Sequence, residues 1–257
     1  MSEFRALVSL KGRQERSLFV VEGLTLVGKA LNDGLPVERI LYTSDLLKDS
    51  DGITLLNQAY VEGVVHNQVS SGLMGTTTTT RPIPPVIASV SMSYRSADDY
   101  HLQAGSSLLI VDGIANPDNL GMVFRTADAA GIEGVIIIEK NASPFHKNCV
   151  RAARGAVGRI PLLRCDEPEI YLRSLDNTGF NVLGATSSAR KELYDLELRT
   201  PLAFVVGNEN DGMRISVRDL CTDLVRIPMA PGQSSLNVGI ATGILLYEFV
   251  RHKMLPG

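Results

Sequence analysis

Three loops that contain glycine carry the polar side chains best suited to bind a ligand: residues 116–121 (NPDNLG), 207–214 (GNENDGMR) and 227–239 (IPMAPGQSSLNVG). The first loop offers Asn119 and, about a turn and a half further along a helix, Arg125, whose guanidinium can hold a phosphate through two hydrogen bonds. The second loop offers the carboxylate of Glu209. The third offers Ser235 and Asn237 at the start of a long apolar helix, where free backbone N–H groups can meet a ligand. Taken singly, the first loop is explained by a helix cap and the second equally well by a polar turn. A cap also explains Ser235 and Asn237, but it does not predict the Ile-Pro-Met stretch at 227–229.

The second loop excludes one familiar nucleotide-binding chemistry. Its glycines nearly match the phosphate-binding pattern GxxxxGK[ST], but Met213 stands at the lysine position and Arg214 at the Ser/Thr position. No GxGxxG pattern follows an expected strand either. A P-loop nucleotidase and a dinucleotide oxidoreductase are therefore not expected.

The elements that must position these loops are alternating strands and helices. Strands are predicted at 107–111, 134–138, 160–163, 181–185, 202–206 and 224–227. Helices are predicted at 119–130, 145–155, 167–176, 214–220 and 236–253. Continuous apolar strands that alternate with helices indicate an α/β domain with a mainly parallel sheet. Ligands of such sheets bind beyond the carboxyl ends of the strands, where the three loops lie.

The N-terminal third predicts a separate small α/β domain. Strands are expected at 18–21, 39–42, 63–65 and 86–90, and helices at 22–32 and 53–60. A polar, weakly patterned stretch follows the last strand. We therefore expect a first domain over 1–91, a linker over 92–106 and a second domain over 107–257.

Composition is that of a globular protein with a local basic segment. The chain has 257 residues, of which 44% are hydrophobic and 21% charged, and its net charge is −3. One segment nevertheless holds six cations and no acid: Lys140, Lys147, Arg151, Arg154, Arg159 and Arg164. A local basic face can bind a polyanion whatever the overall charge, although a solvated helix face explains it equally well.

Other features argue against several protein classes. No apolar run reaches the roughly 18 residues that a membrane helix needs, and the N-terminus lacks an apolar signal segment, so we expect a cytoplasmic protein with no membrane partner. Cys149, Cys165 and Cys221 are too widely spaced for a disulfide framework or a zinc knuckle. The four histidines are also scattered, so no metal is expected.

Taken in order, the loops resemble those of a known enzyme family. The set is N-P-x-N-x-G-x-x-x-R-T-A (116–127), G-N-E-x-x-G (207–212) and I-P-M-x4-S-S-L-N-V (227–238). It resembles the SpoU branch of the SPOUT RNA methyltransferases, over about 107–253. R-x-x-R (13–16) followed by F-V-V-E-G (19–23) is similar to the opening of that family's L30e-like RNA-binding domain.

The resemblance implies a fold and an assembly that residue patterns do not. It implies a SPOUT domain with a deep trefoil knot, formed by the loops after Val206 and Ile227, beside a small L30e-like domain. It also implies a homodimer whose site uses residues of both chains. S-adenosylmethionine is the implied cofactor.

The resemblance also assigns roles to individual residues. The cofactor-binding positions are Thr186, Gly207, Asn208, Ile227, Met229, Leu236 and Asn237. The catalytic positions are Arg125, Asn119, Glu209, Ser235 and Asn237. Because arginine normally stays protonated, we expect Arg125 to position the nucleotide rather than to act as a base. Glu209 either pairs with Arg125 or holds the substrate ribose.

Basic residues outside the loops are the candidates for RNA phosphates. Lys147, Arg151 and Arg154 lie at spacings of four and three residues, so they are expected on one helix face. Arg13 and Arg16 are the candidates in the first domain.

The expected function is methyl transfer from S-adenosylmethionine to a ribose 2′-hydroxyl of ribosomal RNA, specifically 23S rRNA. A transfer-RNA 2′-O-methyltransferase and an antibiotic-resistance rRNA methyltransferase are the alternatives in the same class. A different class is a non-catalytic RNA-binding or ribosome assembly factor. Such a protein should have lost Arg125, Glu209 or Asn237, and all three are present.

Overall fold

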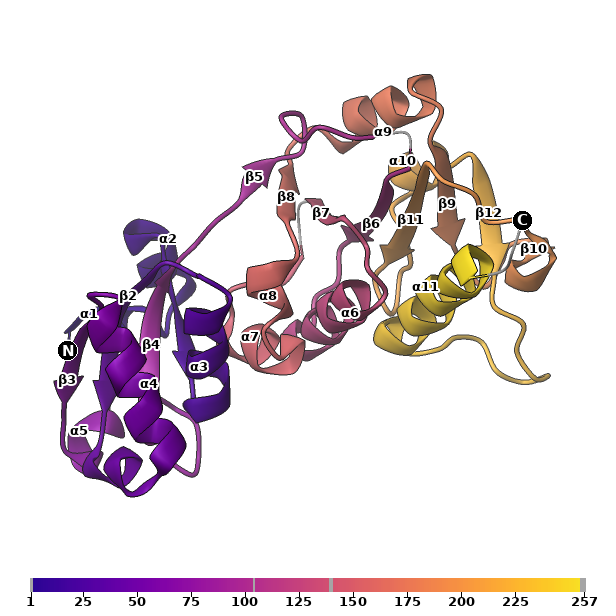
Figure 1. The fold of residues 1–257 in the computed structure, drawn as a ribbon. Coiled ribbons are helices and arrows are strands. Elements are labelled where there is room, and N and C mark those ends of the chain that lie inside the picture. Colours follow the sequence, from indigo (N-terminus) through magenta and orange to yellow (C-terminus); the bar gives the residue numbers. More distant parts are fainter. Residues whose placement is uncertain (1, 104, 139–140, 255–257) are drawn as a thin grey trace. The chain divides into compact units, whose positions relative to one another are not determined.

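A computed structural model of the chain describes residues 2–103, 105–138 and 141–254 (Figure 1). The chain divides into two compact units. The first contains the described residues up to Ser93 together with Ser143–Arg159, and the second contains the other described residues from Tyr94 onward. Each unit has its own sheet and its own apolar core.

The first unit is built on a sheet whose described strands have the order β1-β4-β2-β3. β4 (Val86–Ser91) pairs antiparallel with both β1 (Leu18–Glu22) and β2 (Val37–Tyr42), and β3 (Val65–Gln68) pairs parallel with β2. The helices before and between these strands are α1 (Ser2–Ala6), α2 (Leu10–Arg16), α3 (Leu24–Asn32), η1 (Ser44–Lys48), α4 (Ser50–Val61) and α5 (Ser71–Met74). One apolar cluster of this unit consists of Phe4, Leu7, Val20, Leu41, Met74 and Ile87.

A late segment of the chain also belongs to the first unit. It contains α7 (Lys147–Ala153) and α8 (Ala156–Arg159). The rings of Phe145 and Phe19 lie 4.9 Å apart, and the guanidinium of Arg159 pairs with Asp33 at 2.9 Å. The expected division, which kept residues 107–257 together, therefore differs from the observed units in this segment.

The second unit contains a sheet in which every described pair of neighbouring strands is parallel. The strand order is β10-β12-β9-β11-β6-β7-β8-β5. The strands are β5 (Arg95–Ser96), β6 (Ser107–Asp112), β7 (Gly134–Ile138), β8 (Leu162–Cys165), β9 (Asn181–Ala185), β10 (Lys191–Glu192), β11 (Leu202–Gly207) and β12 (Asp223–Arg226). All six residues of β6 are buried, as the continuous apolar run predicted for a central strand.

Helices cover both faces of this sheet: α6 (Pro117–Ala129), α9 (Pro168–Asn177), η2 (Leu193–Asp195), α10 (Ile215–Arg218) and α11 (Val238–Met254). Leu108 and Ile110 share an apolar cluster with α9 and α10, whereas Phe204 meets Phe249 of α11 edge-on at 6.0 Å. Figure 1 shows α6 and α11 lying side by side. Among the described residues, no helix is long and apolar enough to cross a membrane.

The expected linker, residues 92–106, is mostly part of the second unit. β5 pairs with β8, and the amide of Ala97 donates to the Arg164 carbonyl oxygen at 2.9 Å. The Tyr100 hydroxyl and the Ser106 hydroxyl both bond Glu133, through its carbonyl and carboxylate oxygens respectively. Residues 94–103, 105 and 106 therefore group with the second unit instead of standing apart as a linker, because hydrogen bonds to segments far along the chain hold a stretch without helical or strand periodicity.

Candidate active site

The first loop is held by the cap of α6. The side chain of Asn116 accepts hydrogen bonds from the amides of Asp118 and Asn119, and Pro117 occupies the first helical turn. This turn places Asn119 at the start of the helix. Arg125 lies further along α6 on its exposed face, and its guanidinium bonds no residue that the structure describes.

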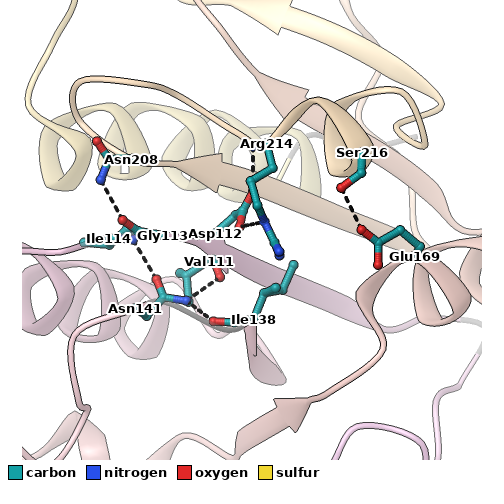
Figure 2. Close-up of polar contacts among 10 residues, drawn as sticks. All are labelled: Val111, Asp112, Gly113, Ile114, Ile138, Asn141, Glu169, Asn208, Arg214 and Ser216. Atoms are coloured by element: carbon teal, nitrogen blue, oxygen red, sulfur yellow. Dashed lines mark hydrogen bonds and ion pairs between the residues drawn. The ribbon is translucent and has the colours of Figure 1, made fainter.

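The second loop is a tight hairpin at the end of β11. The amides of Asn208 and Gly212 donate to each other's carbonyl oxygens, at 2.9 and 3.0 Å. The side chain of Asn208 closes the loop further, because its Oδ1 accepts from the amides of Asn210 and Asp211. Its Nδ2 donates to the carbonyl oxygen of Gly113 at 2.7 Å and so ties the hairpin to the end of β6 (Figure 2).

The three loops meet through a row of side chains. Asn119 Nδ2 donates to Glu209 Oε1 at 2.6 Å, and Asn237 Nδ2 donates to Asn119 Oδ1 at 3.0 Å. Asn237 Oδ1 in turn accepts from the amide of Gly239 at 2.9 Å and caps α11. The pairing of Glu209 with Arg125, one of the two roles expected for the carboxylate, is not seen among the described contacts, where Asn119 donates to Glu209 instead.

Two polar groups that the sequence reasoning missed support the loops from below (Figure 2). Asp112, 1% exposed, accepts from the backbone amide and from Nε of Arg214, each at 2.8 Å. Asn141 accepts from the Ile114 amide at 2.7 Å and donates to the carbonyl oxygens of Val111 and Ile138. Asp112 ends one apolar run of the sequence and Asn141 follows another. A polar residue just after a buried strand was the only sequence feature that could have indicated their supporting role.

A cavity of about 300 Å³ opens beyond the carboxyl ends of β9, β11 and β12. Its lining contains all but one of the predicted cofactor-binding residues: Thr186, Gly207, Asn208, Ile227, Met229 and Leu236. Glu209 and Ser235 line it as well. Asn237, Asn119 and Arg125 are not part of the lining, although the first two bond each other and connect to Glu209.

The charge of this cavity is distinctive. Among the described residues, Glu209 supplies the single ionisable side chain of the lining, and no lysine or arginine contributes to it. Val206, Ile227, Leu236 and Val238 form apolar walls. The site therefore suits a partly apolar ligand that carries positive charge near the carboxylate.

The structure does not place all the residues predicted to contact RNA in the way the sequence suggested. Lys147 and Arg151 lie one turn apart on α7, but the helix ends at Ala153, and Arg154 adopts a left-handed conformation with φ 55°. The prediction that all three share one helix face is wrong for Arg154, since its backbone leaves the helix. Lys147 Nζ donates to the Thr79 hydroxyl.

Two of the other cations in the basic segment form ion pairs with carboxylates. Arg159 and Arg164 pair with Asp33 and Asp166 at 2.9 and 2.7 Å. Lys140 lies outside the described residues.

Arg13 is not available to a phosphate in this structure. Its side chain is buried at 4% exposure, and Nη1 donates to the carbonyl oxygens of Leu7 and Val8. Burial also lowers the pKa of Arg13 below its usual value. The predicted RNA contact is corrected here: Arg13 holds the turn between α1 and α2, whereas Arg16 is exposed.

This assignment makes a prediction about stability. Arg13→Ala is expected to lower the free energy of unfolding by about 2 kcal/mol, because the buried carbonyl oxygen of Leu7 and the partly buried one of Val8 lose their charged donor. Arg16→Ala, at the exposed end of the same helix, should change it by less than about 0.5 kcal/mol. Urea unfolding of both variants measures the difference, and equal stabilities would contradict the structural role.

Two family models match the N-terminal and C-terminal parts of the chain, and the second match runs through residues 143–159, which the structure groups with the first unit. Residues 106–247 match the SpoU rRNA Methylase family, and residues 2–87 match the MRM3-like substrate binding domain. The 23S rRNA (guanosine-2'-O-)-methyltransferase RlmB of Escherichia coli (strain K12) is 31% identical over 97% of this chain and 91% of its own length. RlmB of Vibrio parahaemolyticus is 40% identical over 57% of this chain, and that alignment spans 60% of the relative's length.

Solved structures agree with the sequence comparisons. An AdoMet-bound rRNA methyltransferase from Sinorhizobium meliloti has a TM-score of 0.87 at 30% identity, with 99% of this chain and 95% of that chain covered. AviRb from Streptomyces viridochromogenes, in complex with AdoMet, shares the fold with a TM-score of 0.87 at 24% identity, with 100% and 98% covered. The chain belongs to the SpoU rRNA methylase family.

Proposed function

We propose that this protein transfers the methyl group of S-adenosylmethionine to a ribose 2′-hydroxyl of ribosomal RNA, and that its substrate is 23S rRNA. The observation that carries the proposal is the row Glu209–Asn119–Asn237, which joins the edge of the cavity to the helix that bears Arg125. Relatives named as 23S rRNA methyltransferases support the choice of RNA.

The cavity fits this cofactor. A volume of about 300 Å³ is at the lower end of the range of small-molecule sites. Its apolar walls, including Ile227 and Leu236, suit a flat adenine, and loop amides and carbonyls can bond the edges of the base. The carboxylate of Glu209 complements a sulfonium charge. Bound there, S-adenosylmethionine supplies an activated methyl group, so the transfer requires no metal.

The protein's own residues would then position the acceptor. Arg125, exposed and unpaired among the described residues, holds a phosphate of the target nucleotide and orders its ribose. The proton of the 2′-hydroxyl passes to a phosphate oxygen. Asn119 fixes Glu209 through Oε1, which leaves Oε2 to accept a ribose hydroxyl. Ser235, on the cavity wall, is a further contact for substrate or cofactor.

The assembly is part of the same proposal. We place the active enzyme in the cytoplasm as a homodimer with a trefoil-knotted second unit, on the resemblance of its loop motifs to the family. Met122 on α6 and Ile240 on α11 are 41% and 52% exposed, and the two helices pack together. These apolar side chains support self-association.

A charge-reversal pair tests the RNA surface. Arg151→Glu/Arg154→Glu is expected to weaken RNA binding by at least about tenfold and to reduce the salt slope by about 2, because each exposed cation contributes a phosphate contact. Filter binding at several salt concentrations measures both quantities. Cofactor affinity should stay unchanged.

The matched control changes the same charge elsewhere. Arg173 and Arg199 are exposed cations of the second unit that are not part of the cavity lining. Arg173→Glu/Arg199→Glu should retain RNA affinity within about threefold, because neither residue belongs to the basic segment that is expected to contact RNA phosphates. An equal loss of RNA affinity in the two double variants would show that Arg151 and Arg154 are not specific contacts for RNA.

The activity is tested with labelled S-adenosylmethionine and separated RNA classes. Label in large-subunit RNA is the expected result. Label confined to transfer RNA would move the protein to the alternative substrate. Cofactor binding without transfer to naked RNA or to ribosomal particles would favour a non-catalytic assembly factor. Resistance is tested separately, by the growth of cells that lack the protein in ribosome-targeting antibiotics.

A further inference from the structure

We infer that Asp112 and Arg214 form a clamp that holds Glu209 in its working position, which makes both of them positioning residues for methyl transfer. The inference rests on the proposed function of the Glu209 site. Neither residue is among the described residues that line the cavity, and neither belongs to the set of catalytic residues expected from the sequence.

Both ends of the loop that carries Glu209 lie against the same residue, Asp112. At its beginning, Gly207 of β11 lies beside Asp112 of β6 in the parallel register. At its end, the carboxylate of Asp112 accepts from the backbone amide of Arg214 through Oδ2 and from Nε through Oδ1, each at 2.8 Å (Figure 2). The hairpin that carries Glu209 is therefore attached at both of its ends to the last residue of β6.

A further hydrogen bond holds the same loop against the residue that follows β6. Asn208 Nδ2 donates to the carbonyl oxygen of Gly113, the residue after Asp112. Three residues further on, Asn116 begins the cap of the helix that carries Asn119. The Glu209 loop is thus held by two consecutive residues, Asp112 and Gly113, and the cap of the Asn119 helix follows three residues later along the same chain segment. Loss of that hold is expected to disturb the 2.6 Å bond between Asn119 and Glu209.

The pair is poorly suited to a purely stabilising role. Asp112 is almost fully buried, and burying a carboxylate has a desolvation cost that a single ion pair repays only with full hydrogen bonding. Nη2 of Arg214 is also buried and bonds no described residue. A buried donor left unsatisfied is costly, so the arginine contributes less to stability than its charge suggests. What the pair provides is a defined position for the loop.

A chemically similar pair outside the site supplies the control. Glu248 of α11 is 8% exposed and accepts from Nε and Nη2 of Arg251, at 2.9 and 2.6 Å. Both pairs consist of a buried carboxylate and a partly exposed arginine. The Glu248 pair has no contact with the Glu209 loop among the described hydrogen bonds.

The test compares three single variants of the full chain. Arg214→Met removes the side-chain donor to Asp112 and leaves the backbone donor in place. Arg214→Gln removes the charge but keeps an N–H donor, because Nε2 of glutamine is attached to Cδ as Nε of arginine is. Arg251→Met is the matched control. Turnover is measured at saturating RNA and cofactor, at a temperature where circular dichroism shows each variant folded.

We expect kcat of Arg214→Met to fall by about 100-fold, because displacement of a positioning group by about an ångström has effects of that size. Its KM for the cofactor should rise by less than about fivefold, since Gly207 remains in the β11–β6 ladder. Arg214→Gln should recover kcat to within about fivefold of the unmodified protein, because it retains the donor. Arg251→Met should leave kcat unchanged.

A second readout does not depend on activity. The amides of Asn208, Gly212 and Arg214 are hydrogen-bonded, so hydrogen exchange reports whether the loop is held. Arg214→Met should accelerate their exchange, and Arg251→Met should not. Inactivity of the unmodified protein would count against the proposed function alone, and the exchange data would still decide the clamp.

Two outcomes would overturn the clamp. One is equal kcat and equal loop exchange in Arg214→Met and Arg251→Met. The other is an Arg214→Gln variant as impaired as Arg214→Met, which would show that the donor to Asp112 does not set the position of Glu209.

Discussion

Arg125→Lys is expected to lower kcat by about 100-fold or more at saturating RNA, because a lysine cannot reproduce the planar fork that holds a phosphate at two points. The change should appear in single-turnover methyl transfer, which isolates the chemical step from product release. The affinity for S-adenosylmethionine should stay the same, since Arg125 is not part of the cavity lining.

This variant should fold normally. Arg125 is exposed and bonds no described residue, so the thermal midpoint should stay within about 1 °C, as expected for a surface substitution. Arg173→Lys, an exposed arginine on α9, is the control for the same chemical change. Near-full turnover of Arg125→Lys would show that a positive charge suffices and that the forked geometry has no role.

Gly207→Ala is expected to raise the Kd for S-adenosylmethionine by about 30-fold, which corresponds to about 2 kcal/mol of overpacking at the cavity wall. A Cβ at this position would lie 2.2 Å from the amide nitrogen of Met213 and 2.3 Å from the carbonyl carbon of Gly212. These are backbone atoms, so the whole hairpin must move. Isothermal titration calorimetry measures the effect.

The control for this prediction is another glycine of the second unit. A Cβ at Gly243, in α11, would meet Thr126 at 3.9 Å, which is ordinary van der Waals contact. Gly243→Ala should therefore bind the cofactor like the unmodified protein and be slightly more stable, as helix propensity predicts. If both variants bind the cofactor equally well, the hairpin of Gly207 does not form the wall of its site.

Much of the second unit could be predicted from periodicity. The continuous apolar runs at 107–111, 134–138 and 202–206 all became buried parallel strands, because a strand covered on both faces has no polar side. The glycine loops that follow strands identified the edge of the sheet where the cavity lies. The family prediction is confirmed, on motifs whose order along the chain carries more information than any one of them.

Contacts between distant segments could not be predicted in the same way. Asp112 and Arg214 are 102 residues apart, and nothing near either residue indicates that they meet. The placement of Ser143–Arg159 in the first unit depends on packing such as that of Phe145 against Phe19. Such contacts follow from the folded topology, which local patterns do not encode.

Single cations were the least predictable group. Arg13 and Arg16 share a motif and a helix, yet one is buried among carbonyl oxygens and the other is exposed. Arg154 follows Arg151 at helical spacing, but the helix ends between them. An arginine in a sequence shows that a charge is present, whereas burial and helix termini decide what that charge can reach.

The most direct test of the account is the chemical position of the transferred methyl group. RNA labelled by the protein with radioactive S-adenosylmethionine is hydrolysed in alkali, which cleaves each phosphodiester through attack by the neighbouring 2′-hydroxyl. A 2′-O-methyl group blocks that attack, so the account predicts that the label stays in alkali-resistant dinucleotides from 23S rRNA. Label released in mononucleotides would mean methylation of a base and would contradict the ribose as the acceptor.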